Sequence, residues 1–360
     1  MARATQAIIH LPALIQNYQL AKQHAPQAKA YAVIKANAYG HGLQGVAKGL
    51  AAQADGFAVA CVEEADQIRA AGVDAPIMVL EGPYNEAECQ HAAQQGYELV
   101  VHQAEQLAWL AQVSEPLTLW IKVDTGMHRL GFAMDQVREA VQRLQQPLSC
   151  GQHHQLGLLS HFACADDQTS AFNQLQLSRF QSLADLNLPM SMSNSAAIMS
   201  LTSAHGERLR PGIMLYGGSP LLNTPAQTLG LKPVMTLRSE VIAVHQLTAG
   251  ETVGYGQTWL APRDCKVAVV AIGYGDGYPR RAPNGTPVWL RGQRAWLAGR
   301  VSMDMITVDV TEVEGVQLGD TVELWGEHIP VDEIAHICNT ISYELFCQLT
   351  PRVKRIYTST

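Results

Sequence analysis

The first two thirds of the chain alternate between short apolar runs and longer stretches in which apolar residues recur at helical spacing. Eight apolar runs are strand candidates, at residues 30–34, 56–61, 77–80, 97–101, 118–123, 155–160, 190–193 and 209–215. Stretches with helical spacing lie between them, at residues 43–53, 63–71, 86–95, 103–112, 135–145 and 168–186. This alternation predicts an α/β fold, and eight such strands predict a (β/α)8 TIM-like barrel. The seventh strand has the weakest pattern.

The pattern changes near residue 230 to β-branched runs separated by turn residues. These runs occupy residues 236–246, 265–272, 287–291, 294–297, 305–310 and 321–325, and one helical stretch covers 331–340. We therefore expect two domains, a barrel over residues 1–230 and a C-terminal mostly β domain over residues 231–360. The strand-like residues 5–10 precede the barrel and are candidates to pair with the β domain instead.

The first barrel strand candidate ends in a lysine, Lys35, and Gly40 with Gly42 predicts a turn into the next helix. Burial of an ammonium group is costly, and desolvation lowers its pKa, which leaves a free amine able to attack a carbonyl. Active-site residues of such barrels follow the C-terminal ends of the strands. Lys35 is therefore the candidate nucleophile, although a lysine that simply extends to solvent explains this stretch when it is taken alone.

Polar groups follow other strand candidates as well. Lys122 and Arg129 lie at and after residues 118–123, and His161 follows residues 155–160. A charged barrel rim and a structural histidine are the common alternatives. Ser195 stands at a predicted helix start, where free N–H groups favour an anion, although an ordinary N-cap explains it equally well. Because phosphate sites in such barrels often lie beside strands seven and eight, Ser195 and Gly212 together favour a phosphate.

Composition narrows the classes of protein. The 360 residues carry 25 Lys and Arg against 32 Asp and Glu, a net charge of -7 that argues against a nucleic-acid partner. The seven cysteines include no C-x-x-C pair, and His161 with Cys164 lacks further ligands, so neither a disulfide framework nor a metal site is indicated. No clear signal peptide or membrane-spanning run is present. We expect a cytoplasmic protein with no membrane partner.

Six motifs together resemble those of alanine racemases, pyridoxal-phosphate enzymes with an N-terminal barrel and a C-terminal β domain. The motifs are AVIKANAYGHG at residues 32–42, KVDTGMHRLG at 122–131, SNS at 193–195, RPGI at 210–213, GYG at 254–256 and SMD at 302–304. The resemblance runs nearly end to end. It implies interconversion of L- and D-alanine with pyridoxal 5'-phosphate as the cofactor. The D-alanine would supply peptidoglycan synthesis, or the enzyme would serve alanine breakdown.

The resemblance also implies two catalytic bases. Lys35 would hold the cofactor through its amine and act as a base on one face of Cα, and Tyr255 would act on the other face. Racemisation needs two bases, because the proton is removed from one side and returned from the opposite side. In the family this tyrosine comes from the partner subunit of a homodimer. The active sites would therefore be shared, and a monomer would be inactive.

The resemblance also implies roles for other individual residues. The cofactor-binding positions of the family match Tyr39, His161, Asn194, Ser195, Arg210, Gly212, Ile213 and Tyr343. Arg210 would face the pyridine nitrogen, and an arginine cannot give up its proton to that nitrogen. His161 would hydrogen-bond the catalytic tyrosine and link it towards Arg210.

The substrate carboxylate would contact Arg129 and the backbone N–H of Met303, and Lys122 matches a lysine that is carbamylated in many relatives. Carbamylation would turn a cation that repels Arg129 into an anion that orients it. The residues that match the family's substrate access channel are Tyr274, Arg280 and Arg300.

Three alternatives remain at the level of the sequence. A broad-specificity racemase of the same fold would accept lysine or arginine in a substrate panel, and such enzymes usually carry a signal peptide. A decarboxylase would place an acidic residue where Arg210 stands, and it would release carbon dioxide. A non-catalytic cofactor-binding protein would bind pyridoxal phosphate tightly without racemising alanine, but such a barrel has no need of the added β domain with Tyr255.

Overall fold

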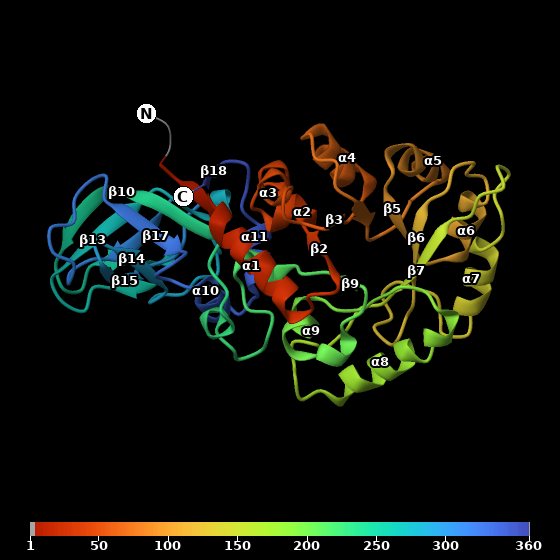
Figure 1. Ribbon diagram of the computed structural model, residues 1–360. Coiled ribbons are helices and arrows are strands. Elements are labelled where there is room, and N and C mark those ends of the chain that lie inside the picture. Colours follow the sequence, from red (N-terminus) through yellow and green to blue (C-terminus); the bar gives the residue numbers. More distant parts are fainter. Residues whose placement is uncertain (1–3, 360) are drawn as a thin grey trace.

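The computed structural model describes residues 4–359, which form an N-terminal barrel and a C-terminal β domain on either side of helix α1 (Leu11–His24) (Figure 1). The barrel strands are β2 (Lys29–Val33), β3 (Gly56–Val59), β4 (Ile77–Val79), β5 (Glu98–Val101), β6 (Thr118–Lys122), β7 (Gln155–Leu159), β8 (Met190–Ser191) and β9 (Arg208–Leu209). They are parallel, in the order β8-β7-β6-β5-β4-β3-β2-β9. The fold class predicted from the sequence is confirmed.

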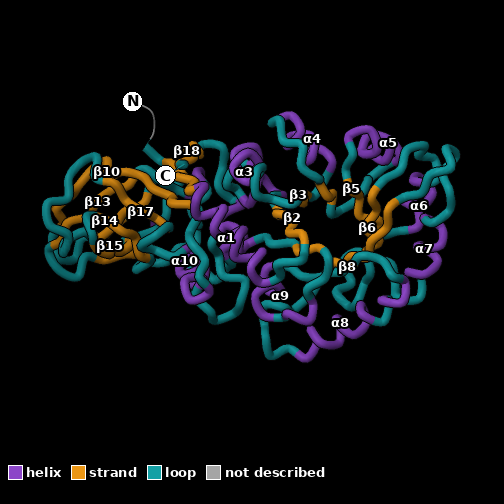
Figure 2. Tube along the Cα trace, viewed as in Figure 1, coloured by secondary structure: helices purple, strands orange, loops and turns teal. Residues whose placement is uncertain are grey.

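The barrel is nearly closed, because backbone bonds join its two outermost strands, β8 and β9. The Glu207 N–H donates to the Met190 carbonyl and the Arg210 N–H to the Ser193 carbonyl, each over 3.0 Å. Helices cover the outside, as the tube view shows (Figure 2). They are α3 (Leu43–Leu50), α4 (Val62–Ala70), α5 (Glu86–Gln95), α6 (Ala104–Leu110), α7 (Val137–Leu144), α8 (Ala171–Gln181) and α9 (Ser195–Ser200).

The predicted eighth strand is wrong over most of its length. It was expected at residues 209–215, but β9 ends at Leu209 and Ile213–Tyr216 form a 3₁₀ turn. Pro211 cannot donate to a ladder, and Gly212 has φ −118° and ψ −98°, which is not a strand conformation. The run is apolar because the side chains of the turn are fully buried, and an apolar run alone does not distinguish a buried strand from a buried turn.

Helix α1 was also missed. Its signals are a proline in the first turn and the buried residues Leu14, Tyr18 and Ala21, which recur three or four positions apart. A side chain of this helix connects the domains, because the Asn17 amide donates to the Leu215 carbonyl at 3.1 Å and to the Lys232 carbonyl at 2.8 Å.

The β domain is an antiparallel barrel from which a two-stranded hairpin projects. Strands β13 (Cys265–Val270), β16 (Ile306–Asp309), β15 (Gln293–Leu297), β14 (Pro287–Leu290), β17 (Thr321–Trp325) and β10 (Met235–Leu247) follow in that order, and β10 pairs with β13 to close the ring. A small hairpin, β11 (Thr252–Val253) and β12 (Trp259–Leu260), projects from it. Helices α10 (Val331–Ile337) and α11 (Ser342–Cys347) complete the domain.

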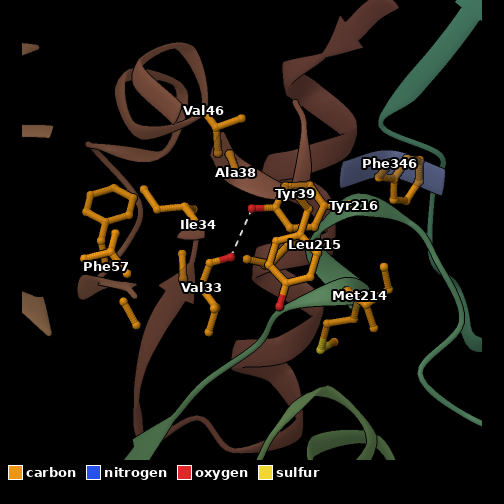
Figure 3. Packing of buried hydrophobic residues seen from close by; sticks show 14 of the residues in the cluster. Val33, Ile34, Ala38, Tyr39, Val46, Phe57, Met214, Leu215, Tyr216 and Phe346 are labelled. Carbon is orange, nitrogen blue, oxygen red and sulfur yellow. Dashed lines mark hydrogen bonds between the residues drawn. The ribbon is translucent and has the colours of Figure 1, made fainter. Parts of the chain in front are cut away.

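The two ends of the chain meet in this domain. Strand β1 (Gln6–His10) pairs antiparallel with β10 and parallel with β18 (Lys354–Thr358). The sequence patterns did not predict β18 or α11. One continuous cluster of buried apolar residues extends from the barrel into the β domain, and Tyr216 and Phe346 lie in it where α11 meets the barrel (Figure 3). The shared core holds the two domains in one arrangement. No helix within residues 4–359 is long and apolar enough to cross a membrane.

Candidate active site

The segment after Lys35 has an unusual backbone. In α2 (Lys35–Tyr39) the φ angles of residues 36–39 are 53°, 54°, 53° and 49°, so four consecutive residues other than glycine are left-handed. This conformation costs roughly 1–2 kcal/mol for each such residue. The predicted glycine turn follows it, with Gly40 and Gly42 at φ 75° and 98°. Backbone strain of this kind persists only where its surroundings enforce it, and it is enriched at functional sites.

A cavity of about 450 Å³ opens above this turn at the C-terminal ends of the barrel strands. Most residues that the sequence predicted for the site line this one cavity: Lys35, Tyr39, Lys122, Arg129, His161, Asn194, Ser195, Arg210, Gly212, Ile213 and Tyr343. They come from the ends of β2, β6, β7, β8 and β9 and from α11. The strand-end rule of a parallel barrel therefore brings together residues that are far apart in sequence.

Hydroxyl groups converge at one part of the cavity wall. The Gly212 N–H donates to Ser195 Oγ over 2.8 Å, and a Cβ on Gly212 would lie 2.8 Å from the Tyr39 hydroxyl. The Tyr343 ring lies beside that of Tyr39, with centroids 5.8 Å apart. Ser195 is not a helix cap, because Asn194 caps α9 by accepting from the Ala197 N–H at 3.0 Å. Hydroxyl donors around a glycine are a donor set that fits a phosphate.

Arg210 is buried behind the cavity and held by several acceptors. Its guanidinium donates to the Ser191 hydroxyl and, over 2.5 Å, to the Ser160 carbonyl, and it lies 3.5 Å from His161 Nδ1. Burial lowers the pKa of Arg210 to about 10, so it remains a cation at neutral pH. Desolvation and the charge of Arg210 lower the pKa of His161 well below its usual value, so this imidazole is neutral. The wall thus presents a fixed positive charge that does not give up a proton.

Two lysines share the cavity with these cations. Desolvation, Arg210 and Arg129 lower the pKa of Lys122 to about 8. Desolvation and Arg129 also lower the pKa of Lys35, which increases the fraction of free amine. Glu81, on the same wall, acts in the opposite direction on both lysines. The lowered pKa predicted for Lys35 therefore has a physical cause in the groups that surround it.

The remaining predicted residues lie elsewhere in the part of the chain that the structure describes. Tyr255, Met303, Tyr274, Arg280 and Arg300 belong to the β domain, and none of them lines the cavity of the same chain. Tyr255 sits in a short turn between β11 and β12 with 70% of its surface exposed. Met303 is 53% exposed and Tyr274 39% exposed, and the two loops are joined by the Gly275 N–H, which donates to the Met303 carbonyl at 2.8 Å.

Some cavity residues were not singled out from the sequence. Glu81 follows β4 by two residues, so the strand-end rule would have found it. Cys347 comes from α11 in the other domain, and no local signal points to it. The other additions are Val33, Ala36, Leu80, Leu130 and Leu159. Among residues 4–359, no three His, Cys, Asp or Glu side chains are grouped to hold a metal ion, and the seven cysteines are free.

A strand-end lysine of lowered pKa, a hydroxyl donor set that fits a phosphate and a second β domain are together typical of barrel enzymes that work through a lysine amine. Comparison with known proteins makes the assignment specific. The alanine racemase N-terminal domain family matches residues 9–220, and the alanine racemase C-terminal domain family matches residues 234–357. The chain belongs to the alanine racemase family and is an alanine racemase, an isomerase. This family uses pyridoxal phosphate.

Individual relatives are similar to this chain over its full length. An alanine racemase of Stutzerimonas stutzeri is 50% identical over 358 residues, which cover 99% of each chain. The crystal structure of the biosynthetic alanine racemase of Pseudomonas aeruginosa is 47% identical, covers 99% of each chain and superposes with a TM-score of 0.95. The structure of alanine racemase from Acinetobacter baumannii is 40% identical, with a TM-score of 0.94 over 99% of this chain and 100% of the other.

Proposed function

We propose that this chain binds pyridoxal 5'-phosphate in the cavity at the barrel mouth and racemises alanine in a homodimer whose subunits complete each other's sites. The observation that carries the proposal is the convergence of Lys35, Arg210 and the hydroxyl cradle on one cavity. When bound, the cofactor withdraws electrons from Cα of the attached amino acid and so makes its proton removable. The protein's own residues then bind, orient and exchange that proton.

The cradle residues would hold the phosphate of the cofactor. The set is Tyr39, Ser195, Gly212, Ile213 and Tyr343, and Asn194 caps the helix that presents Ser195. Arg210 would face the pyridine nitrogen of the bound cofactor and keep its proton, which would limit the negative charge taken up by the ring and suppress side reactions. Arg129 binds the substrate carboxylate, as the Met303 backbone N–H does from the other subunit.

Lys35 moves the proton on one face of Cα and Tyr255 on the other. Within one chain the site lacks its second base, because Tyr255 is exposed on the β domain and does not line the cavity. A second copy of the chain supplies it, and Tyr274, Arg280 and Arg300 of that copy border the access channel. His161, neutral and beside Arg210, hydrogen-bonds the incoming tyrosine.

The name of one relative suggests which physiological role the enzyme has. The relative from Pseudomonas aeruginosa is named biosynthetic. We therefore propose that this chain produces D-alanine for peptidoglycan rather than for alanine breakdown.

Replacing Ser195 with alanine should weaken pyridoxal phosphate binding about tenfold, because a hydroxyl bond to a charged phosphate contributes on the order of 1.5 kcal/mol. Titration of the cofactor-free protein, followed by absorbance, gives the dissociation constant. Ser200→Ala is the matched control, since that hydroxyl lies on the same helix but donates to the Ala196 carbonyl at 2.8 Å. Equal dissociation constants for the two variants would contradict the phosphate role of Ser195.

Unmodified Lys122 should make the stability of the cofactor-free protein rise with pH. Its folded pKa of about 8 lies below its unperturbed value of 10.5, so the unfolded chain binds this proton more tightly. Stability therefore increases from about pH 8 to pH 10, and the full penalty is present below pH 8. Carbamylation, which we propose for this lysine, needs the neutral amine and would remove the penalty.

Urea unfolding between pH 7 and pH 10 measures this rise. Lys122→Met should reduce the rise and stabilise the protein at pH 7, while the exposed Lys48→Met should do neither. Lys35 contributes in the same direction, so the rise should shrink without disappearing. A pH dependence that Lys122→Met leaves unchanged would show that Lys122 is not the group responsible. Carbamylation of Lys122 is a separate question, and a measurement of the intact mass would detect the carbamate.

A further inference from the structure

The left-handed turn after Lys35 is held by side chains from both domains. At its far end, the Arg355 Nε donates to the Gly40 carbonyl over 3.0 Å, and the Tyr357 hydroxyl donates to the His41 carbonyl over 3.1 Å. At its near end, one side chain bonds the backbone beside the lysine. Within the described part of the chain, the only side chain bonded to the backbone of residues 35 and 36 is that of Glu64.

Both carboxylate oxygens of Glu64 accept hydrogen bonds, from backbone N–H groups that follow two different strands. Oε1 accepts from the Ala36 N–H over 2.6 Å, and Oε2 accepts from the Ala60 N–H over 2.8 Å. Ala36 comes three residues after the end of β2, next to Lys35, and Ala60 directly follows β3. The carboxylate therefore joins the ends of two neighbouring barrel strands at the point where the lysine emerges.

Helix capping does not explain this arrangement. Glu64 is the third residue of α4, where a glutamate in a capping box would bond the N–H of the N-cap, here Cys61. One oxygen instead reaches Ala60, outside the helix, and the other crosses to Ala36 on a different strand end. Its negative charge also favours the protonated form of Lys35 and partly offsets the effects of burial and Arg129 on the pKa of that lysine.

We propose that Glu64 is a positioning residue for Lys35, which fixes the left-handed turn by its bond to the Ala36 N–H and thereby sets the direction from which the lysine amine reaches Cα. The proposal rests on the proposed function in taking Lys35 as the group that moves a proton. Glu64 itself touches neither cofactor nor substrate, since it does not line the cavity.

The test compares three variants. Glu64→Gln keeps the size of the side chain but has one oxygen for two N–H donors, and its amide group faces the other donor. Glu64→Asp keeps the charge and reaches one donor at most. Glu63→Gln is the matched control, because Glu63 is an exposed neighbour on the same helix turn and does not contact Ala36.

Two readouts are needed. Hydrogen exchange of the peptide covering residues 35–42, measured on the cofactor-free protein, should quicken in Glu64→Gln and remain unchanged in Glu63→Gln. Racemisation should then fall about 10- to 100-fold in kcat with little change in KM, as expected for a catalytic group displaced by a fraction of an ångström. With Cα-deuterated alanine, the isotope effect should rise for one enantiomer only, since one of the two bases is affected. Glu64→Asp should lie between Glu64→Gln and the parent enzyme.

Each contrary result is decisive. A loss of activity with unchanged isotope effects, or with equal changes for both enantiomers, would mean that Glu64 only stabilises the fold and would overturn the proposal. Unchanged hydrogen exchange would overturn it as well. If Glu64→Gln does not fold, the same two readouts on Glu64→Asp decide. Failure of the proposed function would appear separately, because the parent enzyme would then not racemise alanine, or Lys35→Ala would racemise it as fast as the parent does.

Discussion

Replacing Lys35 with alanine should lower racemisation about 10⁴-fold or more, since in the proposed mechanism this one residue would supply both the covalent attachment of the cofactor and one of the two bases. Lys35 begins α2 two residues after the end of β2, lines the cavity, and has a pKa lowered by desolvation and by Arg129. The purified variant should also lose the visible absorption band of a cofactor bonded to a lysine amine. Racemisation followed by polarimetry or by chiral chromatography measures the first effect, and absorbance measures the second.

The control for this prediction is Lys29→Ala. Lys29 is an exposed lysine at the beginning of the same strand, so its loss removes a positive charge without affecting the cavity. It should keep the activity and the absorption band of the parent enzyme. A Lys35→Ala enzyme that still racemised alanine at more than about one hundredth of the parent rate would refute the role of Lys35 as a base.

Replacing Tyr255 with phenylalanine should lower kcat by about 10²- to 10⁴-fold, because it would remove the proposed second proton-transfer group and leave the cofactor cradle intact. The binding of pyridoxal phosphate should be unchanged, since Tyr255 does not line the cavity of its own chain. Its 70% exposure makes a folding defect an implausible cause of the loss, and thermal unfolding checks that point.

A mixture of Lys35→Ala and Tyr255→Phe subunits tests whether the sites are shared. In a mixed dimer one site has both residues intact and the other has lost both, so an equal mixture should recover about a quarter of the parent activity. Each variant alone gives the baseline. If both residues came from one chain, mixing would restore nothing, and the homodimer with shared sites would be wrong.

The sequence and the structure contributed differently to the individual parts of the site. The alternation of strands and helices predicts the barrel, and the strand-end rule places Lys35, Lys122 and His161 on one rim from the sequence alone. The roles of Tyr343 and Tyr255 came only from the resemblance to a family. Their surroundings carry no local pattern, because their positions near a site depend on another domain or another chain.

Three features had no sequence signal of their own. The left-handed run at residues 36–39 contains alanine, asparagine and tyrosine rather than glycine, so nothing in its composition predicts positive φ angles. The bonds from Glu64 and Arg355 that hold it come from distant segments. The apolar run after Leu209 was read as a strand, because apolar periodicity reports burial and not the backbone conformation.

By itself the sequence determined the order of the elements, the change from barrel to β domain and the identity of the lysine at a strand end. Local propensity and apolar spacing encode these properties over a few residues at a time. Only the tertiary structure decided that Arg210 and Arg129 lie close enough to alter the pKa of Lys122, and that Glu64 holds the backbone beside Lys35. Charge interactions and hydrogen bonds of this kind depend on distances of a few ångströms between segments far apart in the chain, and these distances exist only after folding.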